Sequence, residues 1–208
     1  EANVATGYHA IEFLLWGQDL NGTKAGNGNR SYTDYSLPNC TNENCDRRRA
    51  YLLAAAQLLV KDLEDISYYW SEEGIARKDL LEETSNEGLK RILTGMGSLS
   101  YGELAGERMK LGLMLHDPEE EHDCFSDNTH NSHFYNVIGI KNIYLGTYNN
   151  LNNKTITGDS ISAKVASIDE NLDMEVRNAI NATIDSMTKI VISSEKGVTY
   201  DMLIAEDN

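Results

Sequence analysis

Apolar residues recur at helical spacing along most of the chain. The first stripe predicts a helix over Val4–Trp16, and its members are Val4, Tyr8, Ile11 and Leu15. A second stripe predicts a longer helix that Asp46 caps and that ends near Trp70. Its members are Leu52, Ala56, Leu59, Leu63, Ile66 and Trp70.

The same periodicity continues through the second half of the chain. Three more helices are predicted, over 86–96, 100–115 and 133–148. Ser100 opens a capping-box pattern, and Ser160 and Asp169 are placed to cap a short and a longer helix. The longer helix carries the stripe Ile168, Leu172, Val176, Ile180, Ile184 and Met187. Since no strand-like alternation persists, we expect an all-α protein of antiparallel bundles.

Two long polar segments, 17–45 and 116–132, interrupt the helices. The first is rich in Asn and Gly, and the second holds three of the five histidines. Polar segments of this length in a compact domain are commonly functional or prone to cleavage. Candidate chemistry is therefore expected in or beside them.

Composition and charge exclude several classes of protein. The 208 residues include 18 Lys+Arg and 33 Asp+Glu, which gives a net charge of −15. Such an acidic surface repels phosphate backbones, so we expect no nucleic-acid partner. No apolar run approaches the ~18 residues of a membrane span. The length suits one large or two small domains.

The three cysteines are unevenly placed. Cys40 and Cys45 bracket four polar residues, whereas Cys124 stands alone and its state is left open. A short-loop disulfide between Cys40 and Cys45 is sterically possible and would staple the loop before a helix. A zinc site is less favoured, because no second Cys/His pair has zinc-finger spacing. A disulfide would indicate an oxidising compartment.

The sharpest local motif is Gly7-Tyr-His9-Ala-Ile-Glu12. On a helix, His9 and Glu12 lie on one face, where an imidazole nitrogen and a carboxylate can share a cation. A histidine that is only satisfied by its neighbour's carboxylate is the structural alternative. A zincin needs a second histidine one turn later, and Phe13 stands at that position.

Two further segments combine charged and polar residue types. The loop 117–130 holds Ser126, Asp127 and His130, and the predicted helix before it holds Glu107 and Arg108. Such mixtures of carboxylate, hydroxyl and imidazole recur at binding sites. Loop capping and a structural ion pair are the alternatives for these residues.

Taken together, the segments resemble one known family. GYHAIEFLLWG, CTNENCDRRRAYLLAAAQLLVKDL, ILTGMGSLSYGELAGERM, DPEEEHDCFSDNTH and GIKNIYLG follow one another in the order found in the imelysin family. They are most similar to its iron-regulated branch, bacterial proteins found with iron-uptake systems. The resemblance spans roughly Val4 to Gly146.

The resemblance implies a fold, a location and a site. It implies two four-helix-bundle-like domains, over 1–84 with a long loop and over 85–208, of which the first is incomplete without a preceding segment of the same protein. It implies export to the bacterial periplasm or outer-membrane surface as a lipoprotein. Gly7, His9 and Glu12 carry the family's Gly-x-His-x-x-Glu motif in an inter-domain crevice. The residues implied to face that crevice are Glu107, Arg108, Ser126, Asp127 and His130.

Three functions remain open at this point. The first is a non-enzymatic protein of iron uptake, with His9 and Glu12 binding iron, zinc or an iron-containing small ligand and with membrane components of iron uptake as partners. The second is a metallopeptidase, the activity attached to the family's name, with Glu12 as the base. The third is a structural or partner-binding module in which the two residues only join bundles.

Overall fold

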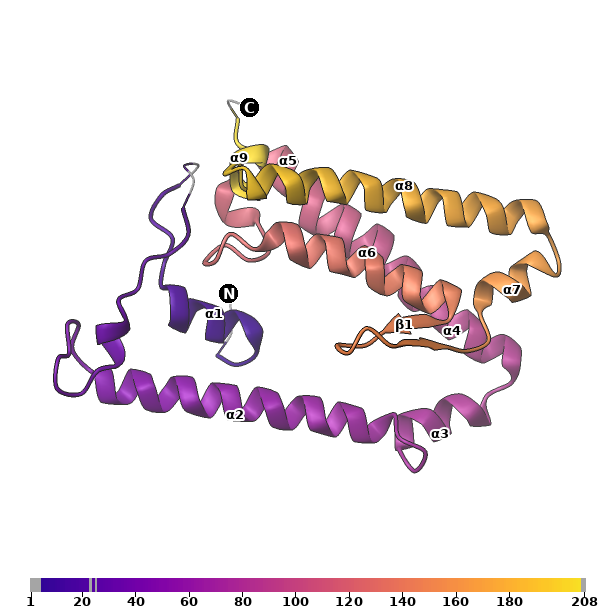
Figure 1. The fold of residues 1–208 in the computed structure, drawn as a ribbon, viewed down its shortest axis with the longest axis horizontal. Coiled ribbons are helices and arrows are strands. Elements are labelled where there is room, and N and C mark those ends of the chain that lie inside the picture. Colours follow the sequence, from indigo (N-terminus) through magenta and orange to yellow (C-terminus); the bar gives the residue numbers. More distant parts are fainter. Residues whose placement is uncertain (1–4, 23, 25, 207–208) are drawn as a thin grey trace. The chain divides into compact units, whose positions relative to one another are not determined.

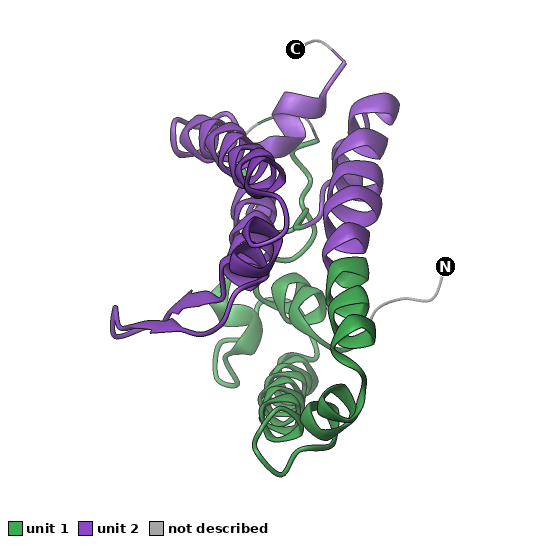
Figure 2. Ribbon diagram, turned by 90° about the vertical axis from the view of Figure 1, so that its right-hand side faces the viewer, with its two compact units in different colours: residues 1–95, 123–127 green, residues 96–122, 128–208 purple. Residues whose placement is uncertain are grey.

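The computed structural model describes residues 5–22, 24 and 26–206. The chain separates into two compact units, which Figure 2 colours differently. The first unit comprises residues 1–95 and 123–127, and the second comprises residues 96–122 and 128–208. A short loop late in the sequence therefore belongs to the N-terminal unit.

The first unit is helical around one long helix, α2. Its elements are α1 (Tyr8–Trp16), the 3₁₀-helix η1 (Tyr32–Tyr35), α2 (Cys45–Tyr69), α3 (Ile75–Glu82) and α4 (Ser85–Gly97), whose last residues pass into the second unit. Both α1 and η1 pack against α2, the long helix in Figure 1. The polar segment 17–45 connects α1 to α2.

The second unit is a helical bundle with one small hairpin. It contains the π-helix η2 (Ser98–Lys110), α5 (Leu111–Leu115), η3 (Pro118–Glu120), α6 (Thr129–Leu145), β1 (Thr147–Asn149), β2 (Thr155–Thr157), α7 (Ile161–Ala166), α8 (Glu170–Glu195) and α9 (Tyr200–Ile204). Helix α6 lies along α8 (Figure 1). The buried centre of the second unit is formed by Leu104, Val137 and Met187. Four partly buried apolar residues pack around it: Met109, Phe134, Ile184 and Ile190.

A buried carboxylate joins three of these helices. Asp173 on α8 accepts hydrogen bonds from Tyr144 on α6 (2.9 Å) and Ser162 on α7 (2.6 Å). The bond from Ser162 is the main reason that the pKa of Asp173 lies below its ordinary value. Burial, with the bond to Asp173, raises the pKa of Tyr144 to about 12, so the tyrosine stays a neutral donor.

The prediction of an all-α protein is confirmed for the described residues, with one short antiparallel hairpin as the exception. The predicted caps of the short helix α7 and the long helix α8 are also confirmed, since Ser160 accepts from the Ala163 amide and Asp169 from the Leu172 amide. Among the described helices, none combines the length and apolarity that crossing a bilayer requires.

The predicted start and inner face of the first helix are wrong. Val4 lies outside the described residues, and α1 begins only at Tyr8, after Gly7 adopts φ +86°. Backbone in that region leaves the right-handed helix and favours glycine. Tyr8, from the predicted apolar stripe, is 66% exposed, and the buried residues are instead Ala10, Glu12 and Leu14.

Two predicted helix starts are also wrong. Asp46 lies inside the first turn of α2 instead of capping it, because the helix begins at Cys45 after Asn44 turns left-handed (φ 59°). Ser100 opens no helix, because Gly97 keeps helical angles and α4 runs directly into η2. A glycine permits a break but does not enforce one.

Helix α3 was not predicted. The helix predicted over 133–148 is present but has other bounds. Helix α6 begins at Thr129 and ends at Leu145, where Gly146 adopts the left-handed conformation (φ 61°) common at helix ends. The chain then forms the hairpin, whose pairs are Thr147–Thr157, Tyr148–Ile156 and Asn149–Thr155.

Truncating Leu104 to alanine should destabilise the second unit by ~3 kcal/mol, the usual cost of a cavity at a buried leucine. Chemical denaturation of the whole chain measures this loss. The control is Leu113→Ala, since Leu113 is half exposed and its truncation should change the unfolding free energy by under ~1 kcal/mol. Equal effects of the two changes would contradict the placement of the core.

Candidate functional site

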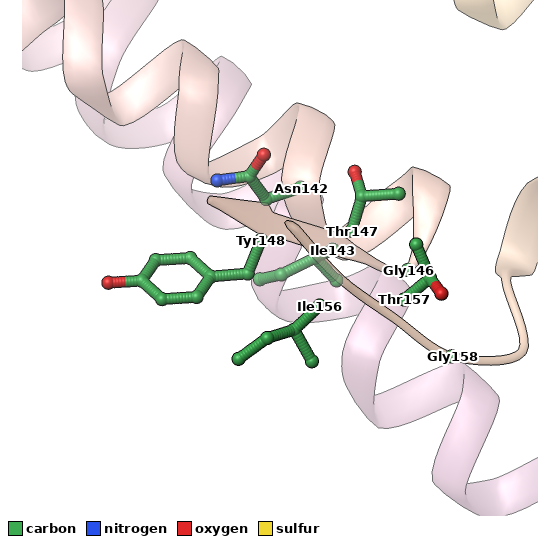
Figure 3. Close-up of a pocket in the computed structure, with 8 residues that line it drawn as sticks. All are labelled: Asn142, Ile143, Gly146, Thr147, Tyr148, Ile156, Thr157 and Gly158. Atoms are coloured by element: carbon green, nitrogen blue, oxygen red, sulfur yellow. The ribbon is translucent and has the colours of Figure 1, made fainter. Parts of the chain in front are cut away.

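One surface groove of the second unit carries no acid–base chemistry. It lies between the end of α6 and the hairpin, as Figure 3 shows, and is lined by Asn142, Ile143, Gly146, Thr147, Tyr148, Ile156, Thr157 and Gly158. Tyr148 and Ile156 are directly paired across the strands and so share one face of the hairpin. With no carboxylate or imidazole in its lining, this groove is not the candidate site.

Helix α1 instead holds an imidazole and a carboxylate one turn apart. Nδ1 of His9 lies 3.0 Å from Oε2 of Glu12. The i,i+3 spacing on a helix places both side chains on one face, as the sequence predicts. Glu12 is only 8% exposed, whereas His9 is partly open to solvent. The Glu12 carboxylate is therefore buried, while the His9 side chain is partly exposed to solvent.

The second oxygen of Glu12 is held by the loop 123–127 of the same unit. The backbone amide and the hydroxyl of Ser126 both donate to Oε1, at 3.0 and 2.6 Å. The loop is anchored beside α1, because Phe125 packs edge-on against Phe13 (5.0 Å) and its carbonyl accepts from the Gly28 amide (2.9 Å). Ser126 thus fixes the orientation of the Glu12 carboxylate.

The same loop brings a second carboxylate to His9. Oδ1 of Asp123 lies 3.6 Å from Nδ1 of His9. Asp123 was not among the predicted site residues, although it lies in the segment 117–130 that combines charged and polar residue types. Nδ1 of His9 therefore lies beside a carboxylate oxygen of Glu12 and a carboxylate oxygen of Asp123.

Glu12 remains a carboxylate in this environment. Burial by itself raises the pKa of Glu12, but the hydrogen bonds from His9 and Ser126 and the charge of His9 outweigh it, so the pKa lies below the ordinary value. A group with a lowered pKa stabilises the fold above its ordinary pKa, and that contribution is lost as the pH falls through the folded value.

The donor set fits a borderline divalent cation. One imidazole nitrogen with two carboxylate oxygens suits ions such as Fe²⁺ or Zn²⁺ better than a soft ion that prefers thiolates. The hydrogen bonds from Ser126 orient the Glu12 carboxylate. In known metal sites, residues that are hydrogen-bonded to a metal ligand orient it in the same way. A second histidine one turn along is absent, and Phe13 packs on Phe125 instead.

A family model settles the relationship to known proteins. The model described as imelysin matches residues 1–206. The chain belongs to the imelysin family. A search of curated proteins returned no significant match.

In this imelysin-family chain the other predicted site residues are divided between the units. Ser126 and Asp127 lie in the loop of the first unit, where Asp127 is buried and left-handed (φ 54°). Glu107, Arg108 and His130 belong to the second unit. Glu12 thus contacts both His9 and Ser126, and a metal- or ligand-binding role for any of the predicted residues stays a prediction.

Within the second unit, two of these residues have local partners. Arg108 pairs with Glu103 (3.0 Å), and Nδ1 of His130 lies 3.0 Å from the hydroxyl of Ser194. Glu107 is exposed. The structural alternative stated for Arg108, an ion pair, is therefore present, although its partner lies on the same helix and not on another.

The second unit also buries a histidine that the sequence analysis missed. His133 is fully buried, with Nδ1 2.9 Å from the Thr129 carbonyl and its ring stacked on Tyr200. Burial above all, with the charges of His122, Arg108 and His130, lowers the pKa of His133 to about 4. His133 is therefore neutral near pH 7. The only signal in the sequence for its contact with the Thr129 carbonyl is the spacing of four residues on a helix.

The predicted disulfide between Cys40 and Cys45 is confirmed, with an S–S distance of 2.02 Å. It closes the turn that leads into α2. Cys124 is half-buried and keeps its thiol.

Replacing Ser126 by alanine should raise the pKa of Glu12 towards its ordinary value, because one donor to the carboxylate is lost. The unfolding free energy at neutral pH should fall by roughly 1–2 kcal/mol, and the difference from wild type should shrink as the pH falls through the pKa of Glu12. Carbon-13 NMR titration of the Glu12 carboxyl measures the shift. Ser98→Ala, at an exposed serine, is the control, and an unchanged Glu12 titration in Ser126→Ala would contradict this role.

Proposed function

We propose that this imelysin-family protein is a non-enzymatic component of bacterial iron uptake that binds iron, zinc or an iron-containing small ligand through His9 and Glu12. Asp123 joins them as a third donor. The observation that carries the proposal is that Nδ1 of His9 lies close to two carboxylate oxygens, 3.0 Å from Glu12 and 3.6 Å from Asp123. Family membership supports the link to iron uptake.

The electrostatics of these residues support binding of a cation. Two carboxylates beside one imidazole leave net negative charge, which a divalent ion would balance. Glu12 is charged before any ion arrives, since its pKa is lowered. The His9 side chain is partly exposed, so an incoming ion would reach it from solvent, and the positive charge of the ion would draw the three donors together.

The proposed location is the bacterial periplasm or the outer-membrane surface, with attachment as a lipoprotein and with membrane components of iron uptake as partners. The disulfide between Cys40 and Cys45 supports the location, because such bonds persist in oxidising compartments. The acidic surface, with a net charge of −15, is compatible with a cation-rich environment.

The peptidase alternative gains less support from the same residues. A zincin-type centre holds its ion with two histidines of one helix and keeps a glutamate for the attacking water. Here Phe13 occupies the position of the second histidine, and both oxygens of Glu12 are engaged by His9 and Ser126. A metal-binding role needs only donor atoms on one helix face, which His9 and Glu12 provide.

Metal titration by calorimetry tests the proposal, with anaerobic Fe²⁺ and with Zn²⁺ as the probes. The wild-type chain should bind one ion, and His9→Ala or Glu12→Gln should weaken binding at least about a hundredfold, because each removes a direct ligand. Asp123→Asn should weaken it by a smaller factor, since its oxygen lies further from His9.

The matched control is His116→Asn, which removes an imidazole of the second unit that bonds the Ile204 carbonyl. Its affinity should equal that of wild type. Equal affinity of wild type and His9→Ala would overturn the proposed site. Peptide cleavage that requires Glu12 would favour the peptidase reading.

A further inference from the structure

The two sulfurs of the Cys40–Cys45 disulfide lie in different environments. Cys40 lies in the exposed turn before α2. Cys45 is the first residue of α2 and is only 3% exposed. An attacking thiolate can therefore reach Cys40 far more easily than Cys45, and access largely decides which sulfur is attacked.

The buried sulfur is placed where it can leave with a negative charge. Nη1 of Arg48 lies 3.9 Å from Sγ of Cys45. The N-terminus of α2 adds the positive end of a helix dipole, an arrangement that stabilises cysteine thiolates. The carbonyls of Thr33 and Asn42 lie 3.7 and 3.6 Å from Sγ, where they can accept a hydrogen bond from the S–H group once the thiol has formed.

The disulfide also closes a loop that holds a buried carboxylate. Thr41 and Asn42, both inside the closed loop, donate to Oδ1 of Asp34 at 2.7 Å each. The guanidinium of Arg48 donates to the Asp34 carbonyl at 2.8 Å. The bond from Thr41 is the main reason that the pKa of Asp34 lies below its ordinary value. The disulfide, Arg48 and Asp34 thus form one connected group.

We propose that the Cys40–Cys45 disulfide is an exchange-active redox site for dithiol reductants. A thiolate of the dithiol bonds to Sγ of Cys40, the Cys40–Cys45 bond breaks, and Cys45 leaves as a thiolate beside Arg48. The second thiol of the reductant then attacks the mixed disulfide and releases Cys40. Two electrons pass to the protein, the dithiol becomes a disulfide, and its two protons end on Cys40 and Cys45.

Reduction changes what holds Asp34. Thr41 and Asn42 are then tethered only through the backbone, so their bonds to Asp34 form against a larger loss of loop entropy. We expect the segment 40–45 to exchange its amide hydrogens faster in the reduced protein. The redox state of this turn is thereby coupled to the order of the segment before α2.

The direction of attack is tested on the whole chain with glutathione, a monothiol that leaves the mixed disulfide in place. A brief reaction is quenched with iodoacetamide, and cleavage after Glu43 separates the two cysteines for mass spectrometry. Glutathione should be found on Cys40 and the alkyl group on Cys45, in at least a tenfold excess over the reverse pattern. The reverse pattern, or no adduct in the folded protein, would overturn the proposal.

The role of Arg48 is tested by the rate of reduction with dithiothreitol. Arg48→Gln should slow reduction about threefold or more, because a less stabilised thiolate leaves more slowly, and Arg48→Lys should stay close to wild type. Arg49→Gln is the control, since Arg49 is exposed. If Arg48 only braced the turn, Arg48→Gln would loosen it and speed reduction, which is the opposite result.

Discussion

The carboxylate of Glu12 is removed from water, and the first unit has to compensate for that loss. A buried charge without partners costs roughly several kcal/mol. Glu12 finds its partners in His9 on the same helix and in Ser126, 114 positions further along the chain. The loop 123–127 must therefore return to α1, and the Phe13–Phe125 contact keeps it there. The grouping of donors at His9 follows from this one requirement.

The second unit also contains polar side chains that are removed from water, and it compensates for their burial in other ways. Asp173 is satisfied by a tyrosine and a serine from two other helices, which makes one carboxylate a joint between α6, α7 and α8. His133 avoids the cost by staying neutral, with one nitrogen at a carbonyl and its ring on Tyr200. The polar groups inside this bundle thus specify which helices meet, while Leu104, Val137 and Met187 supply the apolar area.

Local patterns allowed much of the fold to be predicted, and contacts between distant segments account for the remainder. Helical periodicity and the caps at Ser160 and Asp169 are properties of a few neighbouring residues, and they were predicted correctly. The buried face of α1 was not, since Glu12 is buried by a loop that lies far along the chain. Asp123 was missed for the same reason. The left-handed turn at Asn44 and the unbroken helix at Gly97 could not be read from the residue types, because Asn and Gly both occur in helical and in left-handed backbone.

The π-helix η2 has a consequence for how this chain can change length. Its ion pair joins Glu103 to Arg108, five positions apart, which is the spacing of π-helical hydrogen bonds. Deleting one residue between them would leave a spacing of four, at which an ordinary α-helix also brings opposite charges together. The segment can therefore lose a residue and keep this pair, while every side chain beyond it turns by about 100° around the helix axis. A single deletion there would turn the side chains of α5 around the helix axis without interrupting the helix.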